Sequence, residues 1–407
     1  MAYPAGELEC IRGLACRVAE IAAEPRMTAI LARWRDVSAL RKPDRAPVWC
    51  KPVGCWSEIL PTSSLVCRDP GLRDIELELR KIVFKREVDD DTPVPPYIEA
   101  PAVFQVTPRN IYGLEINHTP SDSPGGAWAY DPPLKSEADF DRLVLPEYHY
   151  DAAATRANRD RMREILGGVL PVKVAVNVSW EGTLGTAAAN LRGLETMMLD
   201  TLDHPDWLHR LMAVVRDAAL RHLDCAEATG VLRTNAYDPM MGSGPVGAIP
   251  PGGRPTCANL WCMANSQEFD QVSPAAWQEF CLEYQKPILR RFGFTGYGCC
   301  ENLTRKLDGV LTIPNLRIVT CGAWTNLDTV IEKTNRRYCI MWRQKASDVV
   351  FARREDEIRG PLEDGARRLR GCYYQIVLRE LQTMAGHSDR LHVWTRLAKE
   401  AAEKYAS

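Results

Sequence analysis

The chain has 407 residues, of which 45% are hydrophobic and 26% charged, and its formal net charge is −2. This composition is typical of a globular protein with a substantial core, and the charge indicates neither a nucleic acid nor an anionic membrane as partner. Because no apolar run reaches the roughly 18 residues of a membrane span and MAYPAGELEC lacks the layout of a secretory signal, we expect a cytoplasmic protein without a membrane partner.

The first 150 residues contain a helical start, one strand and a long irregular stretch. Residues 1–45 have apolar side chains at helical intervals, including Leu14, Val18 and Ile21, and we interpret them as an N-terminal helical extension. The run APVWCKPVGCW predicts a strand followed by a loop, and residues 70–88 predict a helix. The proline- and glycine-rich stretch that follows predicts a loop-rich insertion, a candidate lid. Within its DDD run, Asp91 is interpreted either as an acid or base or as a solvated charge.

From residue 171 onward, strand-like and helix-like segments alternate. The apolar run PVKVAVNVSW precedes a helical segment at 191–229, and LRTNAY predicts the next strand. Ser273 and Pro274 are typical of a helix start, and FTGYGCC, LRIVTCG, RYCIMW and CYYQIVL predict four more strands. This alternation predicts a single (β/α)8 TIM barrel over residues 46–407. A doubly wound open sheet is the alternative, but its GxGxxG match, GSGPVG, continues into AIPPGGRP instead of a helix.

Cysteines adjoin several predicted strands, where barrel enzymes place reactive groups. Cys299 and Cys300 close FTGYGCC, and Cys372 adjoins CYYQIVL. A catalytic zinc site uses about three protein ligands, so Cys300, Cys372 and an acid, Glu268 or Glu301, would suffice. Since adjacent strand residues face opposite sides, we favour Cys300 as the ligand, with Cys299 as its substitute. The alternative is that these thiols are packed and inert.

Three segments together carry a resemblance to a known family: ANSQEFDQVSPAAWQEFCLEYQKPILRRFGFTGYGCCENL, IPNLRIVTCGAW and RGCYYQIVLRELQT. They resemble the uroporphyrinogen decarboxylase superfamily, in particular uncharacterised bacterial members near the zinc- and corrinoid-dependent methyltransferases. The resemblance implies a (β/α)8 barrel and a homodimer. In those methyltransferases zinc is held by a His-x-Cys pair and by a later cysteine that follows a glycine. Cys300 and Cys372 match the two cysteines, whereas Gly298 stands where the histidine would be, so the candidates for a further ligand are Glu268, Cys299 and Glu301.

These observations lead to hypotheses of different classes. The first is zinc-dependent transfer of a methyl group between a small molecule and a corrinoid protein or thiol. The second is a decarboxylase or lyase acting on a small carboxylic acid held by Lys51, Arg343 or Lys345. Uroporphyrinogen itself is excluded, because VWCKPVGCW offers one cation where the decarboxylase has an arginine-rich loop. A third hypothesis is a binding or corrinoid-docking protein without catalysis.

The remaining candidate residues are polar or aromatic side chains near predicted strand ends. We expect catalytic roles for Glu268, Gln267 and Tyr237, and substrate-binding roles for Asn235, Trp56, Lys51 and His387. The alternative for the 235–268 group is a buried polar network that braces the barrel rim.

Overall fold

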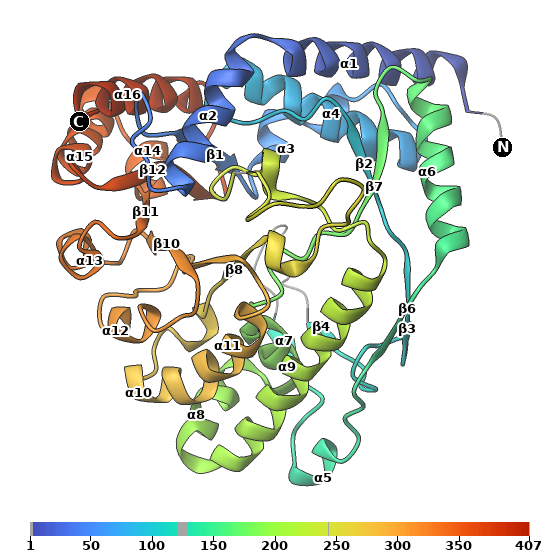
Figure 1. Ribbon diagram of the computed structural model, residues 1–407, viewed down its shortest axis with the longest axis vertical. Helices are drawn as coiled ribbons and strands as arrows, with labels where there is room; N and C mark the ends of the chain where they lie inside the picture. The colour runs from blue at the N-terminus through green and yellow to red at the C-terminus, as the bar shows by residue number, and fades with distance from the viewer. Residues whose placement is uncertain (1–2, 120–128, 243, 407) are drawn as a thin grey trace.

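Six parallel strands form the central sheet of the computed structural model, which describes residues 3–119, 129–242 and 244–406 (Figure 1). In spatial order they are β1 (Val48–Pro52), β12 (Tyr373–Leu381), β11 (Cys339–Arg343), β10 (Leu316–Cys321), β9 (Phe294–Tyr297) and β8 (Trp261–Ala264). The first strand of the chain pairs with the last, and the others follow in sequence order. This order is that of a curled, barrel-like sheet, because a doubly wound sheet reverses its strand order near the middle.

The other side of the barrel is less regular than predicted. Strand β2 (Ile98–Pro101) pairs in parallel with β7 (Val172–Ala175), and one parallel bridge joins Val176 to Leu232. The predicted strand LRTNAY is thus reduced to that bridge and a 3-10 turn, Asn235–Tyr237. Asn235 Oδ1 accepts the hydrogen bond of Trp261 N at 2.8 Å, the place that a strand carbonyl would take. A TIM-like curled sheet is therefore present, whereas an eight-stranded ladder is not formed within the described residues.

The helices surround this sheet, and several match their predicted positions. The predicted helix at 70–88 is α4 (Pro70–Val88), whose N-terminal N–H of Leu72 donates to the Asp69 side chain at 3.0 Å. Ser273 caps α10 (Pro274–Trp277) as predicted, and its side chain accepts a hydrogen bond from Ala276 N at 3.1 Å. The other helices of the first half are α1 (Ala5–Ala23), α2 (Arg26–Ser38), α3 (Trp56–Ile59), α5 (Glu137–Phe140), α6 (Ala152–Leu166), α7 (Gly185–Arg192), α8 (Leu194–Asp203) and α9 (Pro205–Ala228). Those of the second half are α10 (Pro274–Trp277), the π-helical turn Gln278–Leu282, α11 (Glu283–Leu289), α12 (Leu307–Val310), α13 (Leu327–Thr334), α14 (Ala346–Val350), α15 (Glu355–Arg368) and α16 (Arg390–Lys404).

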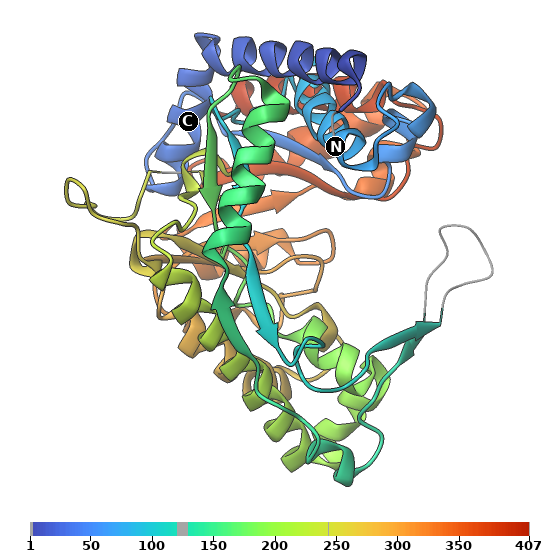
Figure 2. The same cartoon turned by 90° about the vertical axis from the view of Figure 1, so that its right-hand side faces the viewer.

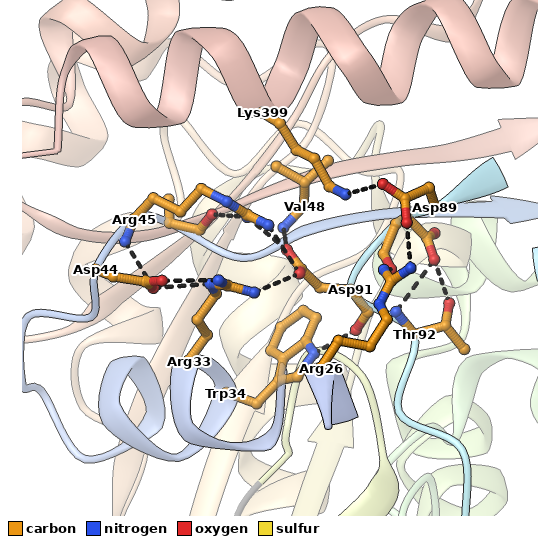
Figure 3. Close-up of polar contacts among 12 residues, drawn as sticks. Arg26, Arg33, Trp34, Asp44, Arg45, Val48, Asp89, Asp91, Thr92 and Lys399 are labelled. Atoms are coloured by element: carbon orange, nitrogen blue, oxygen red, sulfur yellow. Dashed lines mark hydrogen bonds and ion pairs between the residues drawn. The ribbon is translucent and has the colours of Figure 1, made fainter. Parts of the chain in front are cut away.

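Asp91 joins helix α2 and the segment after it to the edge of β1 opposite β12 (Figure 3). Its fully buried carboxylate accepts hydrogen bonds from Arg45, Arg33 and the backbone N–H of Val48, at distances of 2.6 to 3.0 Å. Its backbone carbonyl accepts the indole N–H of Trp34 at 2.6 Å. Neither sequence interpretation of Asp91 was right, because the carboxylate is neither solvated nor free for catalysis. The division at residue 45 stays a prediction.

The loop-rich insertion forms two antiparallel pairs. β3 (Phe104–Thr107) pairs with β6 (Glu147–Tyr150), and β4 (Asn117–Thr119) pairs with β5 (Ala129–Asp131). In Figure 2 the β4–β5 pair projects away from the central sheet. Part of the predicted lid, residues 120–128, lies outside the described residues.

Among the described residues, no helix combines the length and apolar character that crossing a bilayer requires.

Candidate functional site

The two adjacent cysteines follow the carboxyl end of β9, after a sharp turn at Gly298. Strand β9 ends at Tyr297, and Gly298 has a φ of +108°, which L side chains rarely adopt. A Cβ there would also lie 2.7 Å from Leu303 Cδ1 and 2.9 Å from Thr320 Cβ. Because the strand has already ended, the side chains of Cys299 and Cys300 need not alternate, and their Sγ atoms lie 3.6 Å apart.

Strands β11 and β12, which pair with each other, contribute charged side chains next to the two cysteines. Glu380, near the end of β12, lies with its Oε1 3.4 Å from Cys300 Sγ. Arg343, the last residue of β11, donates from Nη1 to Glu380 Oε1 at 2.8 Å and to Cys299 Sγ at 3.5 Å. One atom each from Cys299, Cys300 and Glu380 lie within 4.8 Å of one another. We call these three residues the dithiol cluster.

The electrostatics of the cluster favour an ionised Cys299. A hydrogen bond from Cys300 lowers the pKa of the Cys299 thiol, and the positive charges of Arg343 and Arg379 lower it further, against the effect of burial. The pKa of Cys300 is raised, because the Cys299 sulfur and the Glu380 carboxylate next to it both favour the protonated thiol. At neutral pH the pair therefore holds one thiolate and one thiol, and the thiolate is the nucleophilic form.

The donor set of the cluster fits zinc. Bonds of about 2.3 Å to sulfur and 2.1 Å to oxygen, at tetrahedral angles, separate two sulfurs by about 3.8 Å and a sulfur from an oxygen by about 3.6 Å. The Cys299–Cys300 and Cys300–Glu380 separations are 3.6 and 3.4 Å, and the Cys299–Glu380 separation is within 4.8 Å. Two thiolates and a carboxylate carry three negative charges, which zinc and the neighbouring Arg343 would balance. A zinc ion held by these three residues would keep a fourth position for a substrate.

The cluster separates two cavities. One, of about 410 Å³, is lined by Cys299 and by several polar and charged side chains, including Lys51, Arg233, Asn265, Gln267 and Arg379. The other, of about 190 Å³, is lined by both cysteines and by Trp324, Lys345, Ser347 and Glu380. A ligand in either cavity can therefore reach the sulfur of Cys299.

Cys372 lies at the opposite end of the sheet, which corrects its pairing with Cys300. It immediately precedes β12, whose first residue, Tyr373, pairs with Cys339 at the start of β11. Glu380 lies 380 − 372 = 8 residues further on, or about 26 Å along an extended strand. The Cys372 carbonyl accepts from Lys42 Nζ at 3.0 Å. The prediction took the glycine–cysteine pair at the wrong end of the strand.

Glu301 and Glu268, the predicted acidic ligands, point to other partners. Glu301 is buried, and its carboxylate accepts from the backbone N–H of Ser266 at 2.8 Å and of Cys299 at 2.9 Å. Burial raises the pKa of Glu301. Glu268 accepts from Thr186 Oγ1, at 2.6 Å, and packs against Gly185 of α7. Glu301 thus fixes the cysteine loop, and neither acid joins the dithiol cluster.

The other predicted residues between positions 235 and 268 have different surroundings: one lines a cavity and two pack against other side chains. Gln267, predicted as catalytic, lines the 410 Å³ cavity together with Lys51, which was predicted to bind substrate. Asn235 is buried and uses its amide on Ser179, Asp238 and the backbone of Trp261, as the bracing alternative supposed. Tyr237 packs its ring edge-on against Tyr97, with centroids 5.8 Å apart.

Two further predicted substrate-binding residues lie outside the cavities of the cluster. Trp56 packs on α4, edge-on against Phe84 at 5.8 Å and beneath the Nζ of Lys81 at 5.4 Å. His387 is exposed in a turn after β12, where its N–H donates to the Met384 carbonyl. The loop-rich insertion borders a third cavity, of about 440 Å³, through Tyr112 and Tyr148. The segment predicted as a lid therefore contacts a cavity that the cysteines do not line.

Sequence reasoning missed Glu380 and Arg379. The strand CYYQIVL continues through Arg379 and Glu380 to Leu381, which pairs with Pro52 at the end of β1. These charges therefore lie at the carboxyl end of the strand. Their position could have identified them, because functional residues of barrels gather at the carboxyl ends of strands, at β12 as at β9.

Comparisons with known proteins show the fold alone. No family model matches the chain, and no curated protein matches its sequence. Among solved structures, a methyltransferase from Methanosarcina mazei superposes with a TM-score of 0.52 at 10% sequence identity, covering 93% of this chain and 99% of that one. The chain thus shares the fold of a methyltransferase over nearly its whole length. Membership of the uroporphyrinogen decarboxylase superfamily stays an interpretation.

Proposed function

We propose that the chain transfers a methyl group between a small molecule and a thiol or corrinoid protein, with a zinc ion held by Cys299, Cys300 and Glu380. The observation that carries this proposal is the dithiol cluster, in which two sulfurs and a carboxylate oxygen lie within 4.8 Å at the wall of two cavities. The fold shared with a methyltransferase agrees with it.

Bound zinc would activate a substrate thiol or polarise the atom that carries the methyl group. The surrounding residues hold the donor set in place. Arg343 fixes the Glu380 carboxylate and favours the Cys299 thiolate through its charge. Glu301 holds the backbone of Cys299. In the transfer itself the acceptor forms a bond to the methyl carbon, while the bond to the donor atom breaks and its electron pair stays on the donor.

The decarboxylase or lyase hypothesis remains the second candidate, because the 410 Å³ cavity contains cations suited to an acid. Of the three predicted cations, Arg343 is bound to Glu380 and Lys345 lies over the Trp324 ring at 4.6 Å. Of these three residues, Lys51 alone lines the 410 Å³ cavity. Release of carbon dioxide from a small acid, without methyl transfer, would favour this candidate.

The proposed reaction can be tested with methylcobalamin as donor and 2-mercaptoethanol as acceptor, following the loss of the methylcobalamin absorbance. We expect wild-type protein to catalyse the transfer, to lose activity with a strong chelator and to regain it with zinc. Cys300→Ser should be inactive, whereas Cys372→Ser should retain activity. Equal rates with and without metal, or an active Cys300→Ser variant, would reject zinc-dependent transfer.

A homodimer and a corrinoid partner remain predictions, which gel filtration and co-purification would test.

A further inference from the structure

The 410 Å³ cavity beside Cys299 contains two cationic side chains to which the described residues offer no ion pair. Lys51 points away from the core in the otherwise buried strand β1. Arg379 is largely buried, and its Nε and Nη1 atoms are shielded from solvent without a hydrogen-bond acceptor among the described residues. A buried donor left without a partner destabilises the fold, and more so when it is charged. The fold therefore keeps an unfavourable arrangement at the wall of this cavity.

The other cations of the cavity region have partners. Arg233 forms ion pairs with Asp238 and, at 3.6 Å, with Glu99. Arg343 donates to Glu380 and Cys299. Lys51 and Arg379 are thus the cations on this cavity wall without an acidic partner among the described residues. A bound carboxylate would supply that partner.

We infer that this cavity binds the carboxylate of a small-molecule substrate through Arg379 and Lys51. A guanidinium and an ammonium group are usual hydrogen-bond donors to a carboxylate. The volume of about 410 Å³ lies at the lower end of ligand pockets, and the neutral polar side chains of Asn177, Ser179, Asn265 and Gln267 also line it. The cavity therefore suits a small polar acid.

The position of Cys299 sets where the rest of the molecule lies. Because Cys299 lines the same cavity as Lys51 and Arg379, a bound acid has its reacting end at the sulfur. This second step deepens the proposed function and rests on it: the methyl donor or the acceptor is a carboxylic acid, anchored by its charge and reacting at the dithiol cluster. Carboxylate binding itself needs neither zinc nor turnover.

Binding can be measured by ligand-detected saturation-transfer NMR on metal-free protein, with butyrate as probe and its neutral isostere butyramide as control. We expect butyrate to bind and butyramide to bind at least tenfold more weakly. Arg379→Gln and Lys51→Met should each weaken butyrate about tenfold or more, whereas Arg379→Lys, which keeps the charge, should retain part of the affinity. Lys345→Met removes a cation from the neighbouring cavity and should leave butyrate affinity unchanged.

Equal affinity for butyrate and butyramide would overturn the inference. So would a loss in Lys345→Met as large as that in Arg379→Gln. The assay contains neither metal nor methyl donor, so it separates the two proposals. Charge-dependent butyrate binding in a protein that fails to transfer methyl groups would reject the proposed function and leave the carboxylate site standing.

Discussion

Replacing Asp91 with asparagine tests whether the buried ion pairs of this residue hold helix α2 to the sheet. The carboxylate accepts four hydrogen bonds, three of them from Arg33 and Arg45 and the fourth from Val48 N. The side chain of Asp91 is 1% exposed and that of Arg45 6%. Asparagine keeps the shape but removes the charge and turns an N–H₂ group toward other donors.

The expected loss follows from this burial. Removing one partner of a buried ion pair costs about 3 to 5 kcal/mol, because the other charge stays buried without compensation. At about 2.1 cal/mol/K per residue, unfolding 407 residues carries an entropy of about 0.85 kcal/mol/K. The melting temperature of Asp91→Asn should therefore fall by about 4 to 6 °C in a calorimetric scan.

Asp44 offers a matched control. Its carboxylate accepts two hydrogen bonds from Arg33, both at 2.7 Å, but its side chain is 60% exposed. Exposed pairs contribute about 0 to 1 kcal/mol, so Asp44→Asn should lower the melting temperature by about 1 °C or less. Equal shifts for the two variants would refute the reasoning, because they would show that burial does not set the cost.

Two further predictions concern the cysteine loop. Gly298→Ala should destabilise the fold by about 1 to 3 kcal/mol, because the new Cβ would contact Leu303 and Thr320 at a residue with a positive φ. Thermal unfolding measures this loss, and the control is Gly360→Ala, at a helix position where the new Cβ has open space. In metal-free protein, iodoacetamide should modify Cys299 with a pH midpoint below the usual thiol pKa of about 8.5. Arg343→Gln removes a charge that favours the thiolate and should raise that midpoint, as mass spectrometry of the modified peptide would show; an unchanged midpoint would contradict the electrostatic assignment.

Local patterns predicted much of the fold. Helix α4 covers the predicted residues, the segments FTGYGCC and LRIVTCG contain β9 and β10, and the segments RYCIMW and CYYQIVL contain most of β11 and β12. Each of these rests on signals within a few residues, such as periodicity, caps and apolar runs. The strand LRTNAY failed because a side chain, that of Asn235, supplies the hydrogen bond that a strand would have supplied. Patterns within a few residues do not reveal this hydrogen bond, because its two partners lie 26 residues apart in the sequence.

The site was predictable only in part. Cys299 and Cys300 were found because they follow a clear strand, and Lys51 because it interrupts an apolar one. Glu380 was missed because its partners come from other strands: Arg343 lies 37 residues and Cys300 80 residues away in sequence. Cys372 was chosen because it follows a glycine and adjoins the predicted strand CYYQIVL, without regard to the direction of that strand. The parallel register of β11 and β12 places it at the far end of the sheet.

The zinc content of Cys300→Ser and Cys372→Ser, measured by elemental analysis beside freshly purified wild type, tests the central claim most directly. Both variants replace one sulfur by oxygen, but only Cys300 belongs to the dithiol cluster. We predict about one zinc per chain in wild type and in Cys372→Ser, and a large loss in Cys300→Ser. A wild type without zinc, or a Cys300→Ser variant that keeps it while Cys372→Ser loses it, would contradict the account.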